Sequence, residues 1–86
     1  MFQVSIHSGR VIERCASEQE AIQVASWNAR QLGKRVNVYP VDDAGKCGTR
    51  IVSCYRAGWI YESEIADLPH GEYMARHETM AQASNR

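Results

Sequence analysis

The sequence predicts an α+β fold, with one helix packed on one face of a small, mainly antiparallel sheet of four to five strands. Three observations predict it: an alternating apolar and polar pattern at the start of the chain, a capped helix after it, and a second alternating stretch after the helix. The expected element order is ββαββ(β). We expect residues 1–70 to form this single domain and residues 71–86 to be a marginal helix or a flexible tail.

The first hairpin is expected within residues 2–15. Every second residue before the Ser8-Gly9 turn is apolar, which is the pattern of a half-buried strand. A two-residue loop would pair Ile6 with Val11, and a three-residue loop would pair it with Ile12. Both registers stay open, because the choice decides which face the second strand presents.

The helix is predicted from Ser17 to about Leu32. Ser17 and Glu20 have the spacing of a capping box, and Gly33 can take the left-handed conformation that ends helices. The expected apolar face, which should pack on the sheet, consists of Ala21, Val24, Ala25, Asn28, Ala29 and Leu32, with Ile22 at its margin. Asn28 is expected to hydrogen-bond to neighbouring backbone.

A second hairpin follows the helix. Alternation resumes over residues 36–39, Pro40 indicates an edge strand or a strand end, and residues 42–45 form a turn that leads into a strand over residues 49–55. After another turn at Ala57-Gly58, the chain forms a last strand or only the stub of one.

The end of the chain gives weaker signals. Ser63 is expected to cap a short helical turn that Pro69 stops. Residues 71–86 have no clear apolar stripe tying them to the core, and residues 83–86 are expected to be disordered.

Composition excludes several classes. The 86 residues, 44% hydrophobic and 23% charged, are typical of a globular domain with one modest core. The net charge is zero, with three excess positive charges over residues 1–61 and three excess negative charges over residues 62–86. This balance argues against an acidic DNA mimic and against a general nucleic-acid binder.

No export signal or membrane span is evident, so we expect a cytoplasmic protein without membrane contact. The three cysteines, Cys15, Cys47 and Cys54, have no metal or redox spacing and are expected to be reduced and mostly buried. We predict no catalytic site, no cofactor and no metal site, because the only loop with phosphate-binding character, residues 45–49, lies between two strands.

One candidate surface is the outer side of the helix. Trp27 lies on the helical wheel about 140° from the apolar centre, where solvent is expected. Either a loop or the C-terminal segment covers it, or it anchors an interface, since Trp and Arg dominate binding hot spots. The predicted partner-binding residues are Gln23, Trp27, Arg30, Gln31 and Lys34.

A second candidate surface is the sheet face turned away from the helix. Aromatic residues interleaved with arginines can stack the bases of single-stranded nucleic acid, although they also form ordinary cross-strand pairs. The residues expected on or beside this face are Tyr39, Arg50, Tyr55, Arg56, Trp59 and Tyr61.

The stretch from Phe2 to Tyr61, which begins FQVSIHSGRVIERC, resembles in size and architecture the small hairpin-helix-hairpin proteins of phages and mobile elements, including anti-CRISPR inhibitors. The resemblance implies an inhibitor that occupies a protein surface on a host nucleoprotein complex, the CRISPR effector. It carries over no site residues. The alternatives are a small nucleic-acid-binding or regulatory protein that uses the aromatic sheet face, and a homodimeric structural accessory; a monomer or a homodimer fits the sequence.

Overall fold

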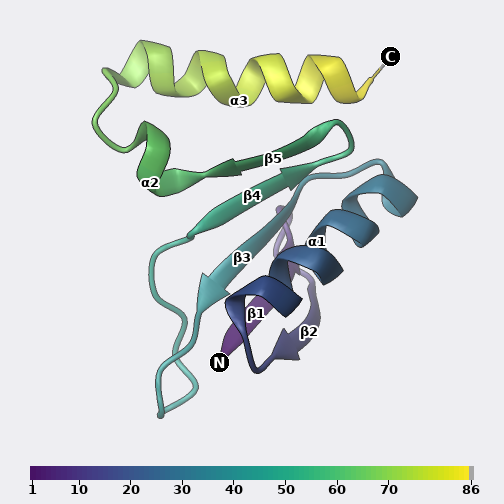
Figure 1. Cartoon of the computed structure of the whole chain (residues 1–86), viewed down its shortest axis with the longest axis vertical. Helices are drawn as coiled ribbons and strands as arrows, with labels where there is room; N and C mark the ends of the chain where they lie inside the picture. The colour runs from purple at the N-terminus through teal and green to yellow at the C-terminus, as the bar shows by residue number, and fades with distance from the viewer. Residues whose placement is uncertain (86) are drawn as a thin grey trace.

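Five strands form one antiparallel sheet between two helices in the computed structural model, which describes residues 1–85 (Figure 1). The elements, in chain order, are β1 (Phe2–Ile6), β2 (Val11–Cys15), α1 (Glu18–Leu32), β3 (Val36–Pro40), β4 (Val52–Tyr55), β5 (Gly58–Tyr61), α2 (Glu62–Ile65) and α3 (His70–Ser84). Across the sheet the order is β2-β1-β3-β4-β5, so β2 and β5 are the edges. The predicted α+β class is confirmed.

The hydrophobic core lies between α1 and the sheet. Valines of the central strands, with almost no exposed surface, pack against small residues of the helix, which let the helix approach the sheet closely. The fully buried apolar residues of the strands are Val4, Val36, Val38, Val52 and Cys54, and the polar Asn37 and Ser53 are fully buried as well.

Both predicted ends of α1 are confirmed. The Ser17 hydroxyl accepts a hydrogen bond from the Glu20 amide at 3.1 Å. Gly33 ends the helix with φ of 63°, a left-handed conformation that favours glycine. Asn28 makes the expected backbone contact, donating to the Val24 carbonyl at 2.8 Å.

The predicted apolar face of α1 was wrong at its C-terminal end. Leu32 is 47% exposed, because it is the last helical residue and projects beyond the part of α1 that covers the sheet. Ile22 and Ser26, by contrast, are buried. The face that packs on the sheet is therefore turned toward β5 relative to the prediction.

Both predicted registers of the first hairpin were wrong. Val4 pairs with Glu13 and Ser5 pairs with Val11, so that Ile12 is an extra residue in a β-bulge. The bulge lets the turn close between Ile6 and Arg10 while the far end of the hairpin keeps its core residues facing α1.

The C-terminal segment is a helix, which was one of the two alternatives expected, but it packs on the sheet rather than being marginal. Ser63 does not cap α2, which begins one residue earlier, at Glu62. Helix α3 spans 15 residues and packs on the sheet face opposite α1, with His77 buried (Figure 1). Of the residues expected to be disordered, Ser84 is the last residue of α3, and Arg86 lies outside the described residues.

Candidate functional site

The five predicted partner-binding residues all lie exposed on or just after α1. Trp27 is 57% exposed, so the alternative in which a loop or the C-terminal segment covers it was wrong. The C-terminal helix is on the far side of the sheet, where it contacts β4 and β5.

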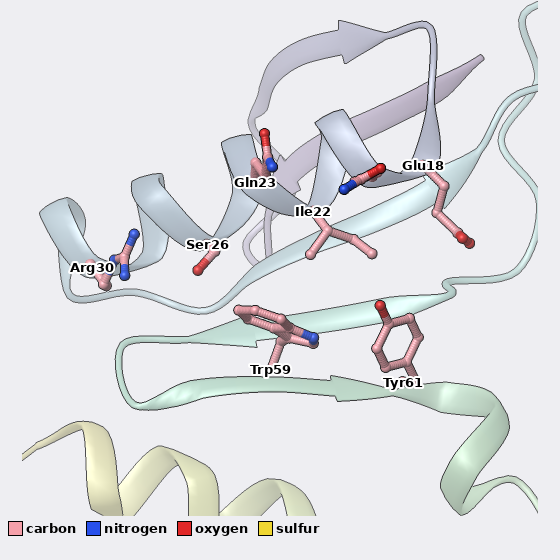
Figure 2. A pocket seen from close by; sticks show the side chains of 8 residues that line it. Glu18, Ile22, Gln23, Ser26, Arg30, Trp59 and Tyr61 are labelled. Atoms are coloured by element: carbon pink, nitrogen blue, oxygen red, sulfur yellow. The ribbon is translucent and has the colours of Figure 1, made fainter.

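A groove of about 620 Å³ runs between α1 and the edge strand β5 (Figure 2). Its floor and walls combine apolar and polar side chains. The residues that line it are Glu18, Gln19, Ile22, Gln23, Ser26, Arg30, Trp59 and Tyr61. We call this feature the α1–β5 groove.

The register of the β4–β5 hairpin explains why two aromatic residues line this groove. Trp59 pairs with Cys54, and Tyr61 pairs with Val52. Residues opposite each other in a ladder point to the same face, and Val52 and Cys54 face α1. Trp59 and Tyr61 therefore point toward α1, and their predicted position on the opposite face was wrong.

The predicted aromatic and basic surface does not exist as one surface. Tyr39 and Arg50 are only partly exposed, Tyr55 is buried with 5% of its surface exposed, and Arg56 is exposed in the β4–β5 turn. With Trp59 and Tyr61 on the α1 face, the six residues are divided among two faces, a turn and the interior. The groove brings together residues of both predicted sets, namely Gln23 and Arg30 with the two aromatics of β5. A smaller hollow at the other end of α1 brings Lys34 close to Tyr55 and Arg56.

On the opposite sheet face, beneath α3, Glu62 is the centre of a buried polar cluster. Its Oε1 accepts hydrogen bonds from Arg50 Nε at 3.0 Å and from Ser53 Oγ at 3.1 Å. Its Oε2 accepts from the Tyr73 hydroxyl at 2.6 Å. Burial alone would raise the pKa of Glu62, but the hydrogen bonds from Tyr73 and Arg50 and the charge of Arg50 outweigh it and hold that pKa below the usual range.

His77 completes the polar cluster. Its Nδ1 is 2.8 Å from the Tyr55 hydroxyl, and its Nε2 lies 3.3 Å from Glu62 Oε1 without the alignment of a hydrogen bond. Burial, and then the charges of Arg35 and Arg50, lower the pKa of His77 despite the nearby carboxylate. The ring is therefore neutral at neutral pH.

A carboxylate, an imidazole and a hydroxyl in line can perform proton transfer in enzymes. Here the imidazole and the hydroxyl are enclosed, since Tyr55 and His77 are 5% and 6% exposed. A substrate has no access to these two groups, and their contact joins α3 to the sheet. Glu62, Arg50 and Tyr73, by contrast, line a hollow at the surface.

Cysteine and metal chemistry add no further site. All three cysteines are free, and burial raises the pKa of Cys15 to about 11 and that of Cys54 to about 12, which keeps both thiols protonated. Within residues 1–85, no group of three or more His, Cys, Asp and Glu side chains has the arrangement of a metal site.

Sequence reasoning missed the polar cluster and four groove residues, Glu18, Gln19, Ile22 and Ser26. The alternation of β4 carried a usable signal for the groove: with a two-residue turn at Arg56-Ala57, Trp59 and Tyr61 are in phase with the apolar residues of β4. No comparable signal links Glu62 to Tyr73 and His77, because the contacts are made only when α3 folds back on the sheet.

Comparison of the chain with protein-family models, with curated protein sequences and with solved structures finds no match in any of the three. No helix in the described part of the chain is long and apolar enough to span a membrane.

Proposed function

We propose that this chain is a non-enzymatic binding protein that occupies the surface of a partner protein with the outer side of α1 and the α1–β5 groove. The observation that carries the proposal is the placement of two exposed tryptophans on adjoining surfaces: Trp27 on the outer side of α1, 57% exposed, and Trp59 on the wall of the groove, 46% exposed. Exposed tryptophans are costly in solution and are the residues most enriched at binding hot spots.

The polar residues around the tryptophans fit this role. Gln23 and Arg30 line the groove and lie on the same side of the helix as Trp27, and Lys34 follows just after the helix end. An aromatic anchor surrounded by polar and arginine side chains is the usual composition of a protein interface.

The resemblance in size and architecture to anti-CRISPR proteins extends the proposal to a partner class. The partner would be a host nucleoprotein complex of the CRISPR effector type, blocked by direct occupation of a protein surface. The zero net charge supports a protein surface rather than a DNA-binding groove as the target.

The burial of His77 and Tyr55 supports the non-enzymatic part of the proposal, because the imidazole and the Tyr55 hydroxyl are both out of reach of a substrate. The division of the aromatic and basic residues among two faces, a turn and the interior weakens the alternative of a nucleic-acid binder, which needs them on one continuous surface.

The test is capture of the partner from a host lysate on the immobilised wild-type protein, identification by mass spectrometry, and titration with purified variants. We expect Trp27→Ala and Trp59→Ala each to weaken the complex by about 2 kcal/mol, roughly thirtyfold in Kd, with little change in thermal stability. Met74→Ala is the matched control, since Met74 is 50% exposed but lies on α3. Wild-type affinity in both tryptophan variants, or an equal loss in the Met74 variant, would contradict the proposal.

A further inference from the structure

We propose that β5 accepts an added strand: an extended segment of the partner pairs with the free edge of β5 and places alternate side chains in the α1–β5 groove. This inference rests on the proposed function and names the form in which the partner binds. It follows from the direction of the main-chain groups, the placement of two side chains and the charges along the groove.

The hydrogen bonds of the sheet fix which way each main chain faces. The amide of His7 in the β1–β2 turn donates to the carbonyl of Arg35 at 2.9 Å, so Arg35 directs its main-chain groups toward β1. Along a strand these groups alternate in direction, so Val36 directs its own toward β4, where Cys54 is its partner. The main-chain N–H and C=O of Cys54 therefore point toward β3, and those of its neighbour Ser53 point toward β5.

The same alternation leaves two residues of β5 with outward main-chain groups. Ser53 pairs with Ile60, so Ile60 directs its N–H and C=O toward β4. Trp59 and Tyr61, on either side of it, direct theirs away from the sheet. Since β5 is the last strand in the sheet order, these groups lie at an open edge.

Helix α3 does not occupy this edge. It packs on the sheet face opposite the groove, where His77 contacts Tyr55 and where a Cβ on Gly58 would lie 3.3 Å from Met80 (Figure 2). The side chains of Trp59 and Tyr61 point to the other face, into the groove. An added strand would run about 4.8 Å from β5, and every second side chain would enter the groove beside these two aromatics.

The charges at the two ends of the groove select a sequence class for a segment antiparallel to β5. Glu18 lies above the Tyr61 end of β5, and Arg30 lies toward the opposite end (Figure 2). The two positions are about 18 Å apart along the helix, which is the length of about five to six strand residues. A segment antiparallel to β5 would begin near Glu18 and end near Arg30, so the groove favours a basic residue at its start and an acidic residue at its end.

A second copy of the chain fits the edge less well. Pairing of two β5 strands would bring together only four residues from each copy. Stable interfaces involve about 20–30 residues a side. A partner segment, whose side chains fill the groove, is the occupant that the geometry supports.

The test begins with selection of displayed random ten-residue peptides on the wild-type protein. A selected peptide is then synthesised and titrated, with the amide shifts of the protein followed by NMR. We expect the largest shifts at Trp59, Ile60 and Tyr61. We also expect N-methylation at the peptide positions whose amides face β5 to weaken binding by more than tenfold, and N-methylation at the intervening positions to change it by less than about threefold.

Two variants separate the main chain from the side chain. Trp59→Ala removes the indole, whereas Trp59→Pro also removes the outward N–H that the added strand would use; proline is tolerated at such edge positions. We expect the proline variant to bind the peptide about tenfold more weakly than the alanine variant, with equal melting curves. An unfolded proline variant would leave the N-methylated peptides as the deciding measurement.

Selection that yields no binder, affinity that is insensitive to the position of N-methylation, or shifts confined to the outer side of α1 would each overturn the strand proposal. A β5-dependent dimer in sedimentation equilibrium would overturn the choice of occupant. The proposed function is tested separately, and it is wrong when a captured partner binds the Trp27 and Trp59 variants as tightly as the wild type. Partner binding that depends on Trp27 but not on β5 would contradict the strand proposal and still support the proposed function.

Discussion

The hydroxyl of Tyr55 and the Nδ1 atom of His77 are 2.8 Å apart and buried, and this contact joins the centre of α3 to β4. It is supported on both sides, since the ring of Tyr73 lies 4.9 Å from the His77 ring and Arg35 lies 5.5 Å above the Tyr55 ring. The C-terminal helix is therefore part of the folded domain.

Deletion of residues 70–86 is predicted to destabilise the protein by about 2 kcal/mol or more. The deletion exposes Tyr55 and removes the hydrogen bond that Tyr73 donates to Glu62. Urea unfolding, followed by far-UV circular dichroism, measures the change. Deletion of residues 85–86 alone is the control and should leave the midpoint unaltered; an unaltered midpoint in the longer deletion would show that α3 adds nothing to stability.

Acid is predicted to destabilise the protein in two steps. Burial and the charges of Arg35 and Arg50 lower the pKa of His77, so the unfolded chain binds its proton more readily, and stability present above about pH 6.5 is lost as the pH falls below that value. The pKa of Glu62 is also lowered, and its contribution is lost as the pH falls below about 4.5.

The measurement is the urea midpoint at a series of pH values from about 7.5 to about 3.5. His77→Gln should reduce the upper step and retain the lower one, because it removes one buried imidazole and leaves the Glu62 carboxylate in place. His7, whose pKa is lowered by burial and by Arg35 and Arg50, titrates in the same upper range, so His7→Gln is the matched control. If His7→Gln reduces the upper step more than His77→Gln does, the upper step belongs to His7 and the assignment to His77 is wrong.

Two substitutions in α1 are predicted to differ strongly in their cost. Ile22→Ala removes a side chain that is 7% exposed in the core and should lower the free energy of unfolding by about 2–5 kcal/mol. Leu32→Ala removes one that is 47% exposed and should cost less than about 1 kcal/mol. Equal midpoints in urea would mean that the buried side of α1 is not the one seen here.

The sequence was sufficient for the elements whose signals are local. The capping box at Ser17, the glycine stop at Gly33 and the alternating strands all depend on neighbours within a few residues, and these elements are confirmed. The exposed position of Trp27 followed in the same way from the helical wheel.

The parts that were wrong depend on distant contacts. The bulge at Ile12 and the burial of Ile22 are set by how α1 seats on the sheet, and the packing of α3 depends on a polar cluster made of residues from β4, α2 and α3. Helix α3 has little amphipathic pattern, because its few buried contacts are made by tyrosine and histidine rather than by an apolar stripe. Prediction of the groove required the β4–β5 register, which decides the sheet face to which Trp59 and Tyr61 point.

The protein is predicted to show no appreciable binding of single-stranded DNA or RNA at physiological salt. Arg50, one of the two arginines of the predicted nucleic-acid surface, donates to Glu62 at 3.0 Å and to Tyr73 at 2.9 Å and is committed to the fold. Arg50→Ala should therefore lower stability by about 1–3 kcal/mol, because it leaves the half-buried carboxylate short of a donor. Arg56→Ala, in the exposed turn, should change neither stability nor binding.

Fluorescence anisotropy with a labelled single strand at several salt concentrations is the measurement. Micromolar affinity that falls steeply with salt, with a slope reduced by about one in Arg56→Ala, would instead favour a nucleic-acid function, because each phosphate contact releases about one counterion.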